Sequence, residues 1–150
     1  MKVLFTCGGT AGHVNPALAV AQTFEKYNPG CQVLFVGAEK GMEKRLVEQA
    51  GYPIRCVKVS TFERQLSWKI IRHNFKSVFK VQVGQWQASR ILRQFKPDLV
   101  VGTGGYASFP AVREATRMGI PTAIHESNAF PGLTTRVLAK RVDLVMVGFP

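Results

Sequence analysis

Short runs of apolar, largely β-branched residues alternate along this chain with longer stretches in which apolar residues recur every three or four positions. Short apolar runs bounded by glycine, proline or polar residues are typical of buried parallel strands. They predict strands at residues 2–7, 32–36, 54–59, 99–102, 122–125 and 144–147. The stretches with three- and four-residue spacing predict helices at residues 17–27, 42–50, 68–95, 110–118 and 134–140.

This alternation predicts the α/β fold class, as a Rossmann-like, doubly wound parallel sheet, because successive parallel strands are joined by right-handed helical crossovers. A chain of 150 residues that is 46% hydrophobic can bury a core as one domain. We find no internal repeat, low-complexity tract or linker, so residues 1–150 are expected to form one domain. Ligands of such sheets bind at the carboxyl ends of the strands.

A glycine turn follows the first predicted strand, with the sequence Gly-Gly-Thr-Ala-Gly at residues 8–12 and then His13. Glycine lets backbone N–H groups approach a ligand closely, and the positive end of the next helix dipole favours an anion. The turn lacks the Lys-Ser/Thr pair of a P-loop and does not fit the dinucleotide pattern. An anionic ligand is therefore predicted here; the alternative is a tight turn in which His13 only caps or packs.

Two further polar segments follow later strands. Residues 102–108, Gly-Thr-Gly-Gly-Tyr-Ala-Ser, come after the fourth strand, and the two glycine turns can converge on one cleft. After the fifth strand, Asn128 can hydrogen-bond sugar hydroxyls or a base edge, and Glu126 can accept from a hydroxyl or position a proton carrier. The alternatives are ligand-free tight turns and, at Glu126 and Asn128, an Asx turn with a solvated carboxylate.

The formal net charge of +11 favours anionic partners, which include nucleic acid, an acidic membrane surface and phosphorylated substrates. The chain lacks RNP, helix-turn-helix and zinc-finger patterns, so we expect no nucleic-acid partner. The three cysteines are far apart and share no C-x-x-C spacing, which argues against disulfides and a zinc site. No apolar run approaches the roughly 20 residues of a membrane span, and the first residues do not resemble a signal peptide.

A basic and aromatic stretch lies between residues 62 and 96, where aromatic and aliphatic residues recur at helical spacing and lysine and arginine flank them. This combination indicates a surface that docks on anionic lipid. The predicted membrane-contact residues are Trp68, Lys69, Arg72, Phe75, Lys76, Phe79, Lys80 and Trp86. In the alternative, Phe75, Val78 and Phe79 belong to the core; Gly84 is a possible break between two helices.

Three segments, in this order and spacing, carry a family resemblance: residues 8–16, 104–108 and 125–134. Together they resemble the N-terminal half of MurG-type glycosyltransferases, the lipid II synthases of bacterial peptidoglycan assembly, over essentially the whole chain. The resemblance implies the N-terminal half of a GT-B fold. It also implies transfer of N-acetylglucosamine from UDP-N-acetylglucosamine to the C4 hydroxyl of the N-acetylmuramoyl sugar of lipid I. This reaction inverts the anomeric centre and uses no metal or other cofactor.

The same resemblance implies roles for individual residues. His13 would be the general base on the acceptor hydroxyl, a role that suits histidine near neutral pH, and Glu126 would be a lesser catalytic candidate that orients it. The implied substrate-binding residues are Thr10, Ala11 and Gly12 of the first turn, Gly104, Gly105, Tyr106 and Ser108 of the second, and Asn128. No Asp-x-Asp metal pair occurs in the sequence, so the charge on departing UDP would be met by helix dipoles and side chains.

The resembling enzymes are more than twice as long as this chain, and the half that binds uracil and the donor sugar has no counterpart here. We therefore expect residues 1–150 to supply the acceptor and membrane side of a hexosyltransferase, at the cytoplasmic face of a bacterial cell membrane, and to be inactive alone. The expected partners are lipid I, UDP-N-acetylglucosamine, anionic membrane and a C-terminal donor domain or donor subunit. The alternative is a non-catalytic lipid-binding subunit that recruits a separate catalytic partner.

Overall fold

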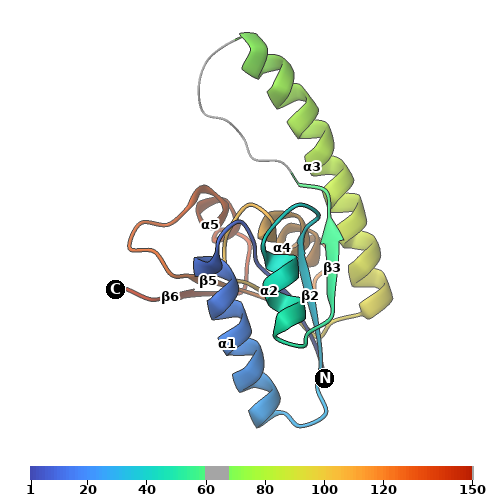
Figure 1. The fold of residues 1–150 in the computed structure, drawn as a ribbon, viewed down its shortest axis with the longest axis vertical. Helices are drawn as coiled ribbons and strands as arrows, with labels where there is room; N and C mark the ends of the chain where they lie inside the picture. Colours follow the sequence, from blue (N-terminus) through green and yellow to red (C-terminus); the bar gives the residue numbers. More distant parts are fainter. Residues whose placement is uncertain (60–67, 150) are drawn as a thin grey trace.

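The computed structural model describes residues 1–59 and 68–149, and for residues 68–81 it describes the backbone only. A parallel sheet of six strands in the order β3-β2-β1-β4-β5-β6 forms the centre of this part of the chain (Figure 1). The strands are β1 (Lys2–Thr6), β2 (Gln32–Ala38), β3 (Ile54–Val57), β4 (Leu99–Gly102), β5 (Thr122–Glu126) and β6 (Leu144–Val147). The helices are α1 (Ala11–Tyr27), α2 (Glu43–Gln49), α3 (Trp68–Phe95), α4 (Ser108–Arg117) and α5 (Leu133–Leu138). The predicted doubly wound α/β fold is confirmed.

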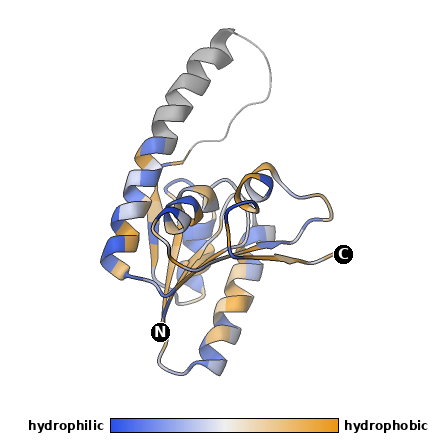
Figure 2. Cartoon of the chain, turned by 180° about the vertical axis from the view of Figure 1, so that it is seen from behind, coloured by the Kyte–Doolittle hydropathy of each residue, from blue (hydrophilic) through white to orange (hydrophobic). Residues whose placement is uncertain are grey.

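Alternating strand residues point to opposite faces of the sheet, and each face carries its own helices. Val3 and Phe5 of β1 pack with α1 and α2, whereas Leu4 packs with α3, α4 and α5. The central strands are apolar on both faces, as expected of a parallel sheet covered on both sides, whereas the edge strand β6 is mostly exposed. Hydrophobic residues are concentrated along the strands (Figure 2). The two hydrophobic clusters fix the register, in which Val3 lies opposite Val33 of β2 and Leu99 of β4.

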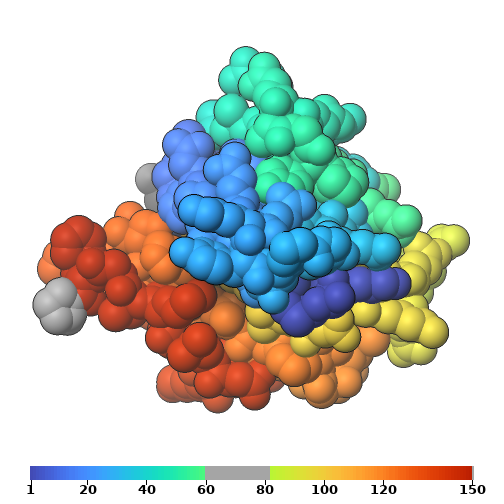
Figure 3. Space-filling view, turned by 90° about the horizontal axis from the view of Figure 1, so that it is seen from below, coloured from blue at the N-terminus to red at the C-terminus, as the bar shows by residue number. Residues whose placement is uncertain are grey.

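At the amino-terminal ends of β1 and β4, contacts between Lys2 and residues 95–98 join the start of the chain to the segment after α3. The Lys2 N–H donates to the Asp98 carboxylate at 2.8 Å, the Asp98 N–H donates to the Lys2 carbonyl at 2.8 Å, and the Lys2 ammonium lies 5.7 Å from the centre of the Phe95 ring. Seen from below, the first residues (dark blue) lie beside the end of α3 (yellow) (Figure 3). The glycine turns lie at the opposite, carboxyl edge, where β1 and β4 end.

Two predicted helices differ from the observed ones in an informative way. Helix α1 begins at Ala11, six residues before the predicted start, and Pro16 lies inside it. Pro16 directly precedes the predicted start and has no N–H to donate to the carbonyl of Gly12 four residues earlier. The glycine turn therefore ends at Thr10, whose extended backbone (φ −146°, ψ 157°) starts the helix, so that Gly12 and His13 are helical.

The possible break at Gly84 does not occur, because α3 runs without interruption from Trp68 to Phe95. Gly84 is buried where α3 crosses the segment after β3, and a Cβ there would overlap the Lys58 carbonyl oxygen. Glycine at this position permits a close approach of two backbones and does not end the helix. The other predicted elements agree with the observed ones to within two residues at each end.

Candidate functional site

The two glycine turns meet at the carboxyl ends of β1 and β4. Gly104 and Gly105 have positive φ values of 97° and 79°, and a Cβ on Gly105 would overlap the carbonyl oxygen of Gly8. The Thr103 hydroxyl, in the second turn, donates to the carbonyl oxygen of His13 at 2.6 Å. The turns therefore form one unit in which the backbone of each fixes the position of the other.

His13 lies in the first turn of α1, with its ring against the second glycine turn. A Cβ on Gly104 would lie 2.9 Å from His13 Nδ1, and one on Gly105 would lie 3.2 Å from His13 Cδ2. His13 Nδ1 is buried and has no hydrogen-bond partner among the described residues, although the side chain as a whole is only half-buried. A substrate hydroxyl could therefore reach this ring only through Nε2.

The exposed part of the first turn is backbone with small side chains. Thr10, Ala11 and Gly12 are exposed, and the N–H groups of His13 and Val14 are bonded to the Thr10 carbonyl at 3.1 and 3.3 Å. The N–H groups of Ala11 and Gly12 lie at the start of a helix, where intrahelical acceptors are missing, and the helix dipole is positive there. This turn can receive an anionic or strongly polar oxygen, as the sequence predicts.

Within the second turn, two side chains that were predicted to bind substrate make contacts inside the protein. Ser108 is buried and its hydroxyl donates to the Gly105 carbonyl at 2.8 Å. The Tyr106 ring lies against Gly9, where a Cβ would be 3.0 Å from the ring, and burial and the nearby Glu43 raise the pKa of its hydroxyl. Tyr106 remains half-exposed and available to a ligand, whereas Ser108 braces the turn.

Glu126, at the end of β5, is 3% exposed and holds the loop that leads to α5. Its Oε1 accepts from the backbone and side-chain nitrogens of Asn128 at 3.0 and 2.7 Å, and its Oε2 accepts from Gly132 N at 3.1 Å and Thr135 Oγ1 at 2.6 Å. Burial raises the pKa of this carboxyl, but the donors outweigh burial and hold the pKa at about 2. Glu126 is therefore ionised at neutral pH.

These hydrogen bonds bear on the two predicted roles in this loop. All four donors to Glu126 come from its own loop and α5, so no contact supports the predicted orienting role toward His13 among the residues described. Asn128 is exposed, and because its side-chain nitrogen is held by Glu126, its amide oxygen is oriented and free to accept from a ligand. Glu126 thus positions Asn128.

A second buried carboxyl group, Glu43, was not predicted from the sequence. It is fully buried, its Oε1 accepts from Ala38 N at 2.6 Å and its Oε2 accepts from Gly9 N at 3.4 Å. Gly8, Gly37 and Gly41 surround this carboxyl so closely that a Cβ on any of them would collide with it. Glu43 therefore connects the first glycine turn to the end of β2, and the only sequence signal for it is an acidic residue two positions after a glycine.

The predicted membrane surface is described only in part. Trp86 is 64% exposed on α3, and Arg90 and Arg93, on the same helix, are also exposed. The remaining predicted contacts, Trp68, Lys69, Arg72, Phe75, Lys76, Phe79 and Lys80, have side chains that lie outside the described residues. None of the helices, over the residues searched, is long and apolar enough to cross a bilayer. Within the same residues, no group of three histidine, cysteine or acidic side chains could hold a metal ion.

A family profile described as the glycosyltransferase family 28 N-terminal domain matches residues 3–147. Among curated proteins, the chain is 45% identical over 149 residues to a protein of Acetivibrio thermocellus and 47% identical to one of Caldanaerobacter subterraneus subsp. tengcongensis. Both are named UDP-N-acetylglucosamine--N-acetylmuramyl-(pentapeptide) pyrophosphoryl-undecaprenol N-acetylglucosamine transferase. The match covers 99% of this chain but 39% and 40% of those relatives.

Solved structures show the same relation. The crystal structure of Acinetobacter baumannii MurG matches with a TM-score of 0.84 and 34% identity, over 99% of this chain and 41% of that one. The Streptomyces glycosyltransferase SsfS6 matches with a TM-score of 0.63 at 21% identity over 94% of this chain and 44% of that chain, which is a likeness of fold alone. The chain thus spans about two fifths of the length of the proteins that it resembles.

Proposed function

The chain belongs to glycosyltransferase family 28, as that family's N-terminal domain, and on this premise we propose that it forms the acceptor-binding half of a lipid II synthase. The complete enzyme transfers N-acetylglucosamine from UDP-N-acetylglucosamine to the C4 hydroxyl of the muramoyl sugar of lipid I. The donor half is supplied by sequence beyond this chain or by a partner subunit, since the named relatives are about two and a half times as long.

The observation that carries the proposal is the unit formed by the two glycine turns around His13. Its exposed edge offers the start of helix α1, a half-buried imidazole reachable at Nε2 and the half-exposed Tyr106. The start of a helix suits the pyrophosphate of lipid I, or a phosphate of the donor. The amide oxygen of Asn128, fixed by Glu126, can accept from a hydroxyl of the donor sugar.

In the proposed reaction, the acceptor C4 oxygen attacks the anomeric carbon of the donor sugar from the face opposite UDP. The new C–O bond forms as the bond to the β-phosphate oxygen breaks, and UDP leaves with that electron pair. His13 Nε2 accepts the hydroxyl proton as general base. The developing charge on UDP is stabilised by helix N-termini and donors of the donor half, and no metal takes part.

Membrane association is part of this proposal, because the acceptor carries an undecaprenyl chain. Trp86 together with Arg90 and Arg93 combines an exposed aromatic ring with two cations on one helix. Each cation near an anionic surface contributes about 1 kcal/mol. The complete enzyme therefore works as a peripheral protein on the cytoplasmic face of the bacterial cell membrane.

The first test is co-sedimentation of the 150-residue chain with anionic vesicles that contain or lack lipid I, over a range of salt concentrations. We expect lipid I to increase the bound fraction and the increase to persist at salt concentrations that release the chain from plain vesicles. Binding that is the same with and without lipid I at every salt concentration would contradict an acceptor site in this domain.

The second test addresses His13 in a hybrid enzyme, in which this chain replaces the matching segment of the Acetivibrio thermocellus relative. With the unmodified hybrid as the active reference, His13→Ala should lower kcat by about 10²–10⁴-fold, the range for a lost general base, with a small effect on the donor KM. Asn15→Ala, an exposed change in the same helical turn, serves as the control. Near-normal turnover of the His13→Ala hybrid would contradict the general-base role.

A further inference from the structure

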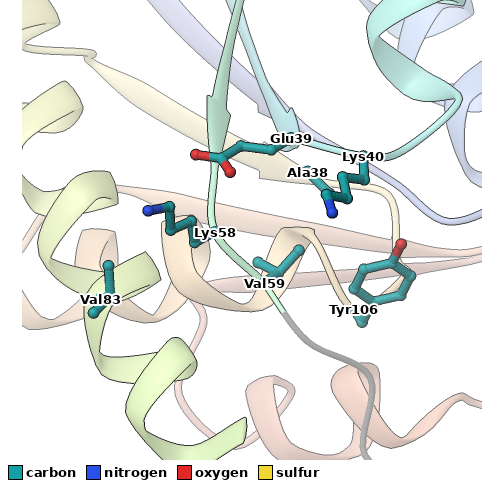
Figure 4. Close-up of a pocket in the computed structure, with 7 residues that line it drawn as sticks. All are labelled: Ala38, Glu39, Lys40, Lys58, Val59, Val83 and Tyr106. Atoms are coloured by element: carbon teal, nitrogen blue, oxygen red, sulfur yellow. The ribbon is translucent and has the colours of Figure 1, made fainter. Parts of the chain in front are cut away.

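A cavity of about 480 Å³ lies beside the glycine turns, at the carboxyl edge of the sheet (Figure 4). This volume lies within the range of about 300–1,000 Å³ that is typical of small-ligand sites. Three elements and one turn contribute to it: the end of β2, the segment after β3, helix α3 and the second glycine turn. Among the residues that the structure describes, the cavity is lined by Ala38, Glu39, Lys40, Lys58, Val59, Val83 and Tyr106.

Neighbouring contacts hold the walls of this cavity in place. The Lys58 N–H donates to the Gln87 side chain at 2.7 Å, and the Lys58 carbonyl lies directly against Gly84, so the peptide groups before and after the Lys58 Cα both contact α3. At the opposite wall, the Ala38 N–H donates to the buried Glu43 at 2.6 Å. The side chains at the rim are therefore carried by a fixed backbone.

Tyr106 joins the cavity to the proposed reaction site. One side of its ring faces Gly9 of the first glycine turn, and the same side chain forms part of the cavity wall. A ligand bound at the glycine turns would therefore extend into the cavity past Tyr106. Tyr106 is thus the residue that the cavity wall and the glycine turns have in common.

The chemistry of the lining selects the class of ligand. In Figure 4, Lys40 and Tyr106 lie on one side, Glu39 and Lys58 lie on the other, and Val59 lies between them. A site for phosphate alone would be weakened by the Glu39 carboxylate, which repels anions. The described lining, with two amines, one carboxylate, a phenol and an aliphatic floor, instead matches a short peptide, which offers carboxylates, N–H groups and small apolar side chains.

We propose that this cavity binds the peptide branch of the acceptor, an inference that rests on the proposed function. The relatives are named for an N-acetylmuramyl-(pentapeptide) acceptor, so a peptide must be attached to the sugar near the reaction site. A peptide linked through its amino end has a free carboxylate at the other end, and Lys40 and Lys58 receive its carboxylates. Glu39 accepts from an amine or a backbone N–H of the same peptide.

The experiment titrates the 150-residue chain with soluble probes and follows backbone amide resonances. N-acetylmuramyl-pentapeptide, which has neither pyrophosphate nor lipid, should bind at least about tenfold more tightly than N-acetylmuramic acid, and shifts should include the amides of Lys40, Lys58 and Tyr106. Lys40→Gln and Lys58→Gln should each weaken this binding by about fivefold, as expected for exposed ion pairs. Lys26→Gln, an exposed lysine near the end of α1, should have no effect.

Other outcomes overturn the inference. Equal affinity for N-acetylmuramic acid and its pentapeptide would exclude a peptide site, and so would equal binding by the two lysine variants and the unmodified chain. Competition by inorganic phosphate would assign the lysines to a simple anion site. Competition by peptide-free anionic vesicles would assign them to a lipid headgroup.

A second pair of measurements separates this inference from the proposed function. Anionic vesicles carrying lipid I are compared with vesicles carrying the same lipid from which the peptide has been removed. A preference for the peptide-bearing lipid that Lys40→Gln and Lys58→Gln abolish supports the peptide site. Equal binding of both lipids, above that of plain vesicles, overturns the peptide site and leaves the acceptor function standing. Binding no better than to plain vesicles overturns both.

Discussion

The loop after β5 and the pair of glycine turns lie at the same edge of the sheet but differ in how far their polar groups are hydrogen-bonded within the protein. Around Glu126, both carboxylate oxygens accept two hydrogen bonds each, from four donors within ten residues. Around His13, the backbone is fixed by Thr103 and by the contact with Gly105, yet Nδ1 is buried without a partner among the described residues, and Thr10, Ala11 and Gly12 at the helix start are exposed.

This difference distinguishes Glu126, which supports a loop, from His13, which we propose takes part in the reaction. A carboxylate whose acceptor positions are filled, and whose pKa is held at about 2, has neither a proton nor an open acceptor site to offer a substrate. An imidazole on a rigid backbone, with part of its ring exposed, can exchange a proton. The fold therefore satisfies its own polar groups where it builds a loop and leaves them unsatisfied where we propose that a substrate binds.

The largest expected effect comes from breaking the contact between the two glycine turns. Gly105→Ala puts a methyl group into the Gly8 carbonyl and strains a residue with φ of 79°, so unfolding free energy should fall by about 3 kcal/mol or more. Gly51→Ala is a matched control, because Gly51 has φ of 84° but open space around its Cβ position, and should cost about 1 kcal/mol. Urea unfolding of both variants measures the difference, and equal losses would contradict the packing of the turns.

Breaking the hydrogen bonds around Glu126 should lower the unfolding free energy somewhat less than Gly105→Ala does. Glu126→Gln replaces one carboxylate oxygen by an NH₂ group that faces donors, so we expect a loss of about 2–3 kcal/mol in unfolding free energy. Glu48→Gln, an exposed change, should stay within about 0.5 kcal/mol of the unmodified chain. A loss for Glu126→Gln no larger than this control would show that the four hydrogen bonds add nothing to stability.

The stability that ionised Glu126 contributes should depend on pH. The folded pKa of Glu126 is about 2 against an ordinary value of 4.5, so its ionised form stabilises the fold above pH 4.5 and that contribution is lost as the pH falls toward 2. The difference in unfolding free energy between the unmodified chain and Glu126→Gln should therefore shrink by about 1 kcal/mol for each unit by which the pH falls over this interval. Urea unfolding at pH 6, 4 and 3 measures it, and a constant gap would contradict the lowered pKa.

The smallest expected effect comes from removing the hydroxyl that fixes His13. Thr103→Val deletes the hydrogen bond to the His13 carbonyl and should cost about 1 kcal/mol of stability, whereas Thr103→Ser keeps the hydroxyl and should recover part of the loss. In the hybrid enzyme, Thr103→Val should lower kcat more than it raises the acceptor KM, since it moves the base without removing a binding group. Equal stability and kcat for the valine and serine variants would show that this hydrogen bond does not position His13.

The fold class and the order of elements follow from the sequence alone, because apolar runs without polar interruption are typical of strands buried on both faces of a parallel sheet, although the run in the edge strand β6 is mostly exposed. The sequence also identified both glycine turns, since close backbone approaches leave glycine as a visible mark, and the Glu126-Asn128 segment at a strand end. It misplaced the start of α1, which includes Pro16, and allowed a break at Gly84, because local rules for glycine do not register that the Lys58 carbonyl requires a residue without Cβ at position 84.

Which polar groups already have hydrogen-bond partners within the protein became clear only from the folded chain. Ser108 and Glu126 match polar binding residues in sequence but make their hydrogen bonds within their own loops, and Glu43, marked in the sequence only by the glycine two positions before it, supports the first glycine turn from the end of β2. The cavity beside Tyr106 likewise combines residues from positions 38 to 106. Even partners a few positions apart, such as Ser108 and Gly105, leave no distinctive sequence pattern, since a hydrogen bond depends on where the folded backbone places its two atoms; Glu43 and Gly9, moreover, are 34 positions apart.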